Sequence, residues 1–180
     1  GVALVYGRVR IQEIGGEILA ASKPNISVVQ GNIRQDLKWD TTFKRETIEK
    51  YGSLSIGAAQ KKPELIIWPE TALPFYYGND TLYSNQVDVY VRKVKTHFLV
   101  GSPAFERGKE KPRFYNRAYM LNPLSLVAGT YDKTHLVPFG EYVPLENYLT
   151  FLGKITQQAG NFSAGDKTFV PLAFKDHRTG

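Results

Sequence analysis

The stretch PELIIWPETALP, residues 63–74, contains a short apolar run, Leu65 to Trp68, that ends at a proline followed by an acid. A continuous apolar run of this length is typical of a strand buried on both faces. Glu70 then lies just beyond the carboxyl end of that strand, where α/β sheets place their ligand sites. Glu70 is therefore a candidate catalytic carboxylate; the alternative is an acid that satisfies the turn before a helix.

Short apolar runs and longer amphipathic segments alternate on both sides of this stretch. Valines at helical spacing predict a helix at 83–95, and HFLVGSP at 97–103 predicts the next buried strand. Strand, helix and strand in this order predict a βαβ unit, and hence an α/β protein. Further strands are expected at 25–31, 114–121, 126–131, 162–170 and 172–175, and a further helix at 42–60.

A second stretch rich in reactive side chains is YDKTHLVPFGEYVP, residues 131–144. Lys133 and Glu141 are eight positions apart, which is too far for a pair on one helix face. A turn at Pro138-Phe139-Gly140 would fold the two side chains toward one pocket. Because an expected strand ends at this stretch, its location matches that of Glu70.

Residues 1–24 are expected to lie outside a domain formed by residues 25–180. The opening GVALVYGRVRI is apolar and then basic, as at the end of a membrane helix. A strand with alternating Val and Arg is the alternative. Residues 13–24 lack a clear period and are expected to form a linker. No run of eighteen apolar residues is present to span a membrane.

Composition narrows the choice of partners. The net charge of +6 and the pI of about 9.4 suit an anionic partner such as phospholipid headgroups or nucleic acid. Nucleic acid is not expected, because no motif of interleaved aromatic and basic residues supports it. Neither a metal nor a cofactor is expected, because the three histidines lie far apart and no GxGxxG or P-loop pattern occurs. The chain contains no cysteine, and so no thiol nucleophile.

Several motifs in order carry a resemblance to a known family: VVQGNIRQDLKWD (28–40), PELIIWPET (63–71), HFLVGSP (97–103), YNRAYMLNP (115–123), YDKTHLVPFGEYVP (131–144) and FSAGDKTFVPL (162–172). Together they resemble the nitrilase, or carbon-nitrogen hydrolase, superfamily. Within it, the chain is most similar to the periplasmic catalytic domain of the bacterial apolipoprotein N-acyltransferases. The similarity covers about residues 26–180.

The resemblance implies an αββα sandwich of the nitrilase type and a Glu-Lys-Cys triad. By motif, Glu70 matches the general base, Lys133 the lysine, Glu141 a supporting glutamate and Trp39 a functionally important tryptophan that would contact substrate. These residue types suit the chemistry. A glutamate can take the proton of a thiol, and an ammonium can stabilise an oxyanion. A second carboxylate keeps the lysine charged and oriented.

The resemblance also implies a two-step reaction at the bacterial inner membrane, with the catalytic domain facing the periplasm. A phospholipid acyl group moves to the cysteine as a thioester, and then to the N-terminal amine of a diacylglyceryl-lipoprotein. Membrane attachment would come through segments outside this chain. Because the cysteine is missing, the sequence is expected to stop before the nucleophile, and the 180 residues are expected to be inactive alone.

Two other functions stay open at this point. One is a soluble amidase of the same superfamily that hydrolyses a small amide. The other is a homologue without a nucleophile that binds a ligand and performs no chemistry.

Overall fold

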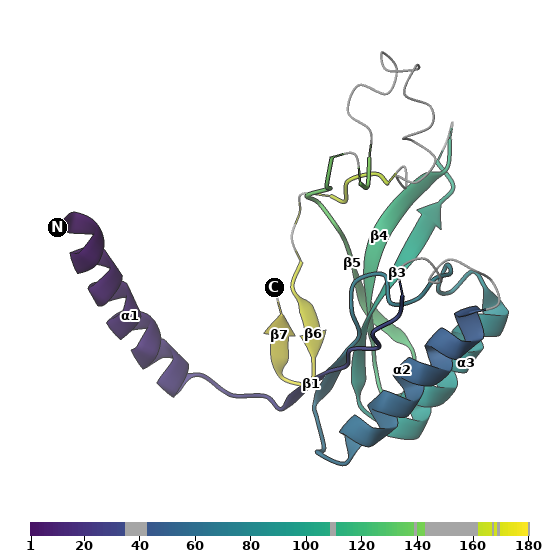
Figure 1. Cartoon of the computed structure of the whole chain (residues 1–180), viewed down its shortest axis with the longest axis horizontal. Helices are drawn as coiled ribbons and strands as arrows, with labels where there is room; N and C mark the ends of the chain where they lie inside the picture. Colours follow the sequence, from purple (N-terminus) through teal and green to yellow (C-terminus); the bar gives the residue numbers. More distant parts are fainter. Residues whose placement is uncertain are drawn as a thin grey trace.

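A five-stranded sheet with two helices against it forms the body of the protein in this computed structural model (Figure 1). The structure describes residues 1–34, 43–108, 111–138, 140–142, 162–166, 168 and 170–179. The elements of the body are β1 (Ile26–Val28), α2 (Phe43–Ala59), β2 (Leu65–Ile67), α3 (Thr81–Val94), β3 (His97–Glu106), β4 (Arg113–Leu121) and β5 (Val127–Asp132).

The strand order in the sheet follows the chain, β1-β2-β3-β4-β5. The first three strands are parallel, with Leu65 opposite Ile26 on one side and His97 on the other, whereas β4 and β5 are antiparallel to their neighbours. The βαβ unit predicted around β2, α3 and β3 is therefore confirmed, as is the α/β class. Because β2 is shorter than β3, the residues that follow β2 lie beside the middle of β3, where Trp68 donates to the Leu99 carbonyl and Leu73 to the Gly101 carbonyl.

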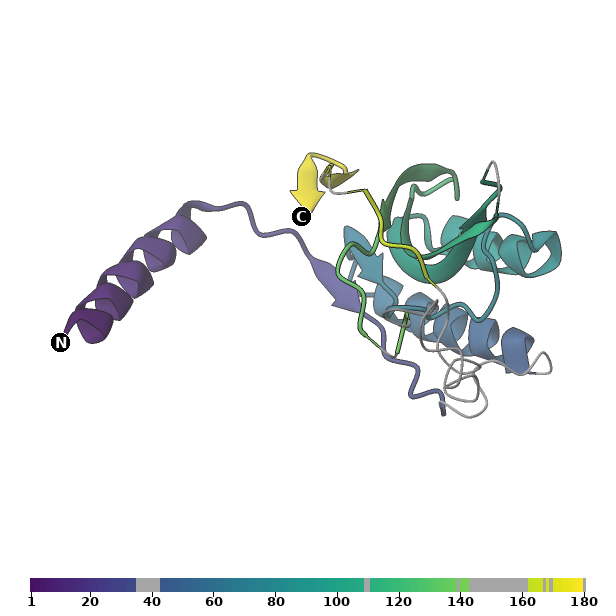
Figure 2. The ribbon, with the colours of Figure 1, turned by 90° about the horizontal axis from the view of Figure 1, so that it is seen from above.

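The main core lies between the sheet and the helices, which share one side of it (Figure 2). Tyr51 of α2 and Val87 and Val91 of α3 are buried against the strands. Trp68, just after β2, stacks on Tyr51 with ring centroids 5.1 Å apart. Its indole N–H donates to Ser55 Oγ at 2.9 Å, and Ser55 Oγ donates to the Tyr51 carbonyl at 2.8 Å, so these two buried polar groups are satisfied. Each fully buried large apolar side chain contributes about 1.5–3 kcal/mol.

The opposite face of the sheet carries a smaller cluster formed by Leu65, Met120 and Phe174. Phe174 belongs to a C-terminal hairpin, β6 (Leu172–Phe174) and β7 (His177–Thr179). Leu65 and Ile66, which are consecutive in β2, thus belong to different clusters, because successive side chains of a strand point to opposite faces. The continuous apolar run of β2 is explained by burial on both faces.

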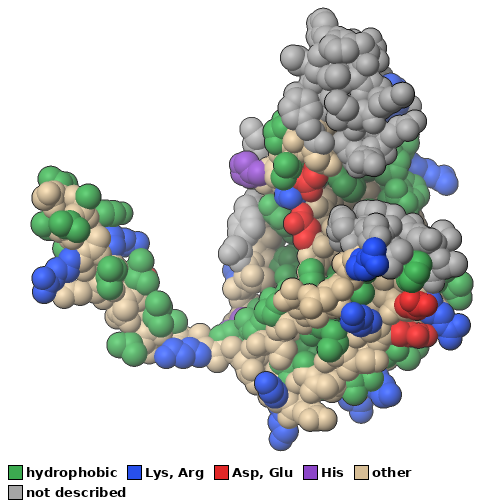
Figure 3. Space-filling view, viewed as in Figure 1, with side chains coloured by type: hydrophobic (Ala, Val, Ile, Leu, Met, Phe, Trp, Pro, Cys, Tyr) green, Lys and Arg blue, Asp and Glu red, His purple; other side chains and the backbone are tan. Residues whose placement is uncertain are grey.

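The N-terminal segment forms α1 (Val2–Ala20), which has no buried residue. Figure 3 shows apolar side chains along this helix, and the most exposed of its large apolar residues include Val2 and Leu4. The helix continues through the glycine pair at 15–16, so the linker predicted at 13–24 was wrong for residues 13–20. Among the helices described, none is long and apolar enough to cross a membrane.

The strands predicted at 162–170 and 172–175 have different outcomes. The strand expected at 172–175 is confirmed as β6. The one expected at 162–170 was wrong, because among its described residues only Phe162 forms an isolated bridge, with Phe114. The described backbone here donates hydrogen bonds to several other elements, which prevents a regular ladder.

Candidate active site

Glu70 lies in a tight turn that follows β2. The N–H of Ala72 donates to the carbonyl of Pro69 at 3.1 Å, and Thr71 takes a left-handed φ of 47°. Such a φ is uncommon for a β-branched residue and marks local strain. The turn lies directly on β3 at Gly101, where an added side-chain carbon would come within 2.5 Å of the Thr71 nitrogen. Gly101 therefore lets the glutamate turn approach the sheet.

Lys133 follows β5, and its position is fixed by its own backbone hydrogen bond and by the side-chain pair of the residue before it. Its N–H donates to the carbonyl of Asn116 at 2.9 Å. The preceding residue, Asp132, accepts from Arg117 through both carboxylate oxygens, at 2.6 and 2.8 Å. This hydrogen bond is the main cause that raises the pKa of Arg117, so its guanidinium stays charged. A two-pronged pair of this kind fixes geometry as well as charge.

Glu141 reaches the same site through the turn predicted after Val137. The N–H of Glu141 donates to the Val137 carbonyl at 2.9 Å, and its Oε2 accepts from the Val137 N–H at 2.8 Å. The turn folds Glu141 back beside Lys133, as the sequence predicted. Phe139 in this turn lies outside the described residues.

The three charged side chains meet although they come from distant parts of the chain. Lys133 Nζ lies 2.9 Å from Glu70 Oε1, and 3.1 and 3.0 Å from the two oxygens of Glu141. The hydrogen bond to Glu70 is the main cause that raises the pKa of Lys133, so its ammonium stays charged at neutral pH. Burial would raise the pKa of Glu141, but the Val137 N–H and the side chains of Asn116 and Lys133 together lower it.

The two glutamates occupy different environments. The side chain of Glu141 is 14% exposed, and both its oxygens accept hydrogen bonds. The side chain of Glu70 is 59% exposed. Its Oε1 accepts from Lys133 and Asn116, and no described residue donates to its Oε2. Glu70 thus presents an oxygen that is free to accept a proton, whereas Glu141 is held as a fixed counter-charge.

Asn116 also belongs to this site, although sequence reasoning did not identify it as a site residue. It lies on β4 opposite Pro103 and is only 7% exposed. Its Nδ2 donates to Glu70 Oε1 at 2.6 Å and to Glu141 Oε1 at 2.9 Å. The only local signal was an amide within a strand of mostly apolar residues, and this pattern does not indicate which residues the amide contacts.

Residues 162–165 bind this region together from outside the sheet. The N–H of Phe162 donates to the carbonyl of Glu141 at 2.9 Å, and that of Gly165 donates to the carbonyl of Lys133 at 3.0 Å. A side-chain carbon at Gly165 would lie 2.3 Å from the Asp132 carbonyl oxygen. The segment therefore connects the backbone at Lys133 with the backbone at Glu141.

Two further expectations concern Trp39 and metal binding. Trp39 lies outside the described residues, so its predicted contact with substrate stays a prediction. Within the described parts of the chain, no three histidine, aspartate or glutamate side chains lie close enough to hold a metal ion. The chemistry that the site offers is proton transfer to Glu70 and charge stabilisation by Lys133.

This combination of an α/β sheet and a glutamate-lysine-glutamate cluster at its edge is the one implied by the nitrilase class. Residues 25–175 match the family described as "Carbon-nitrogen hydrolase", and the chain belongs to that family. The solved amidase from Nesterenkonia sp. has a similar fold, with a TM-score of 0.56 at 14% identity over 85% of this chain and 52% of that one.

Two curated relatives narrow the similarity within the family. Apolipoprotein N-acyltransferase of Geobacter metallireducens is 40% identical over 91% of this chain and 31% of its own length. The protein of the same name from Brucella suis biovar 1 is 34% identical over 86% of this chain and 30% of its own length. The resemblance inferred from the motifs is thus confirmed. The chain spans about a third of the length of these relatives.

Proposed function

We propose that this chain belongs to a catalytic domain that transfers a fatty acyl group from a phospholipid to the N-terminal amine of a diacylglyceryl-lipoprotein. The observation that carries the proposal is the contact of Lys133 with both Glu70 and Glu141 in a member of the carbon-nitrogen hydrolase family. The names of the two curated relatives support the choice of reaction.

The first step needs a cysteine thiol, which these 180 residues do not contain. Glu70 Oε2 takes the thiol proton, and the thiolate attacks the acyl carbonyl of the phospholipid. Glu141 holds Lys133 in place, and Lys133 stabilises the oxyanion that forms. The ester C–O bond then breaks, and the leaving lysophospholipid alkoxide takes the proton back from Glu70. The product is a thioester of the cysteine.

The second step uses the same groups in the same roles. Glu70 takes a proton from the attacking lipoprotein amine, and Lys133 again stabilises the oxyanion. The C–S bond breaks, an amide forms, and the thiolate recovers its proton. Water must be excluded while the thioester exists, because hydrolysis would compete with transfer. Trp39 would contact the substrate in this scheme.

The proposal extends to location. The reaction joins two lipid-bearing substrates, so we place it at the bacterial inner membrane, with the catalytic domain facing the periplasm and further segments of the protein providing membrane attachment. The exposed apolar side chains of α1 are consistent with a position near lipid. The 180 residues alone are expected to be inactive, because they lack a thiol.

The test uses the whole gene product that contains this chain. It is mixed with phospholipid vesicles that carry a labelled acyl chain and with a synthetic diacylglyceryl-cysteine peptide. The expected product is the peptide with one labelled acyl chain on its amine, detected by mass spectrometry, and a peptide with a blocked amine should stay unmodified. Hydrolysis of small amides without any acyl transfer to the peptide would overturn the proposal in favour of an amidase.

A further inference from the structure

Among the residues that the structure describes, Asn116 is the uncharged side chain that contacts both glutamates of the site. Its Nδ2 donates to Glu70 Oε1 and to Glu141 Oε1, at 2.6 and 2.9 Å. Its backbone carbonyl accepts the N–H of Lys133 at 2.9 Å. Asn116 is buried and lies in the middle of the β3 and β4 pairing, so its own position is fixed by the sheet.

The charges at the site explain why a neutral donor is useful there. Two carboxylates share one ammonium, and Lys133 Nζ contacts the same Oε1 atoms that Asn116 contacts. The two negative charges repel, and a single lysine does not neutralise both. A second cation would hold them together but would also make the base a weaker proton acceptor. An amide supplies two N–H donors in a planar fork and adds no charge.

We infer that Asn116 is a positioning residue that holds Oε1 of both Glu70 and Glu141, and so leaves Oε2 of Glu70 free to accept the proton of the nucleophile. The inference rests on the proposed role of Glu70 as the base. Asn116 acts through the two glutamates and does not itself contact a reacting atom. A purely structural asparagine, by contrast, would support β4 without affecting the ionisation of the neighbouring carboxylates.

The first test follows ionisation and needs no activity. The carboxyl carbons of glutamate are labelled in the 180-residue chain, and Glu141 is titrated by NMR in wild type, Asn116→Ala and Asn116→Asp. Both substitutions remove N–H donors, so the pKa of Glu141 should rise. Asn116→Asp keeps the size of the side chain, which provides a second variant if Asn116→Ala fails to fold.

Asn122, which directly follows β4, provides a matched asparagine control. Its Oδ1 accepts from the N–H groups of Leu124 and Leu126, both at 2.9 Å, and a carboxylate oxygen can accept these bonds equally well. Asn122→Asp thus adds the same charge at a distance from the site, and it should leave the titration of Glu141 unchanged. An unchanged titration in both Asn116 variants would overturn the inference.

The second test measures acyl-thioester formation by the whole gene product. Asn116→Ala should lower kcat about a hundredfold with little change in KM, because misplacement of a reacting group by about 1 Å costs about that much. Asn122→Asp should stay within about twofold of wild type. The activity of Asn116→Asp relative to wild type should rise at low pH, since a protonated carboxyl regains one donor, whereas Asn116→Ala should show no such recovery.

The two tests separate the inference from the proposed function. A raised pKa of Glu141 in the variants supports the hold of Asn116 on the carboxylates, even if the wild-type gene product transfers no acyl group; that second result would overturn the proposed function alone. Wild-type rates in Asn116→Ala, in a gene product that does transfer acyl groups, would overturn the inference and leave the proposed function standing.

Discussion

Lysine and glutamate side chains pair at both ends of the parallel strands, with different surroundings. At the carboxyl end, Lys133 contacts Glu70 and Glu141. At the amino end, Lys175 Nζ lies 3.0 Å from Glu64 Oε2. The side chain of Lys133 is 27% exposed, and that of Lys175 is 50% exposed. The number and rigidity of the contacts around each pair, more than the ion pair itself, distinguish the two ends.

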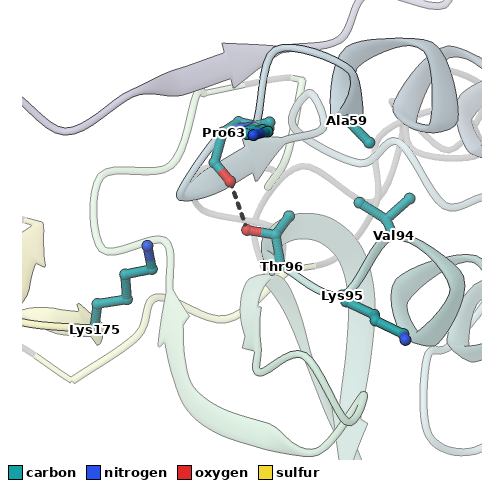
Figure 4. Close-up of a pocket in the computed structure, with 7 residues that line it drawn as sticks. Ala59, Pro63, Val94, Lys95, Thr96 and Lys175 are labelled. Atoms are coloured by element: carbon teal, nitrogen blue, oxygen red, sulfur yellow. Dashed lines mark hydrogen bonds between the residues drawn. The ribbon is translucent and has the colours of Figure 1, made fainter.

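The amino end also contains a cavity of about 310 Å³ (Figure 4). Its lining includes Lys62, Lys95 and Lys175, together with Thr96, which donates to the Pro63 carbonyl at 2.8 Å. Lys62 and Lys95 follow the ends of α2 and α3, where a positive charge offsets the negative end of the helix dipole. Helix termination explains the positions of Lys62 and Lys95, and Lys175 is a solvent-exposed lysine.

A site differs from a charged surface in how its charged groups are held. Each charged group at the carboxyl end has at least two fixed partners, and Asn116 adds neutral donors to both glutamates. Preorganised groups of this kind stabilise developing charge without reorganisation. At the amino end, Lys175 is more solvated than Lys133, so its ion pair with Glu64 carries less interaction energy.

The largest expected difference between the two ends is in activity. In the whole gene product, Lys133→Ala should slow acyl transfer by about a thousandfold, because the oxyanion loses its charged donor. Lys175→Ala, which removes the same charge from the other end, should stay within about twofold of wild type. Equal losses in the two variants would show that net charge matters more than position. Initial rates with labelled phospholipid vesicles provide the measurement.

The second prediction concerns the close contact that supports Glu70. A side-chain carbon at Gly101 would meet only backbone atoms, at 2.5, 2.7 and 2.9 Å, and backbone cannot rotate away. Gly101→Ala should therefore lower the free energy of unfolding by about 1–3 kcal/mol, as overpacking does. Urea unfolding of the 180-residue chain measures this value.

Gly57 provides the control for Gly101. It lies on α2, and an added side-chain carbon there would have nothing within 4 Å. Gly57→Ala should raise stability by about 0.5–1 kcal/mol, because alanine favours the helix. If the two alanine variants had the same stability, the close approach of the Glu70 turn to β3 would be contradicted.

A smaller effect is expected from pH. The pKa of Glu141 is lowered in the folded protein, so its contribution to stability is complete above its unfolded pKa of about 4.3 and is lost as pH falls through the folded pKa. Glu141→Gln should cost about 1–2 kcal/mol at pH 7. The difference from wild type should shrink between pH 5 and pH 3. A constant difference across this range would argue against the charge as the cause.

The smallest effect is expected at the exposed pair. Glu64 also has a lowered pKa, for which the hydrogen bond from Lys175 is the main cause. Lys175→Ala should nevertheless leave the urea midpoint at pH 7 within experimental error, because exposed ion pairs contribute little. A loss of stability as large as that of Glu141→Gln would remove the distinction between the two ends.

Local sequence was sufficient for most of the fold. The apolar run at Leu65 and the valine spacing of α3 predicted the elements correctly, because burial imposes a period on the sequence. The helix at residues 13–20 was not predicted. Because α1 buries no residue, no core imposes an apolar period on its sequence. Prediction also failed at 162–170, where the backbone bonds to other elements of the fold.

The site was predictable in part. The turn that brings Glu141 to Lys133 followed from their spacing and the residues between them. The pairing of Glu70 with Lys133, which are 63 positions apart, came from the family resemblance, since local patterns carry no information on such distances. Asn116 was missed because its partners are distant in sequence, and a strand asparagine has many possible roles.

Intact-mass measurement of the acyl-enzyme is the direct test of Glu70 as the base of an acyl-transfer site. The wild-type gene product, incubated with phospholipid vesicles without acceptor, should gain the mass of one acyl chain. Glu70→Gln should form this species about a thousandfold more slowly, while Glu46→Gln, an exposed change on α2, should match wild type. Acylation of Glu70→Gln at the wild-type rate would show that Glu70 is not the base.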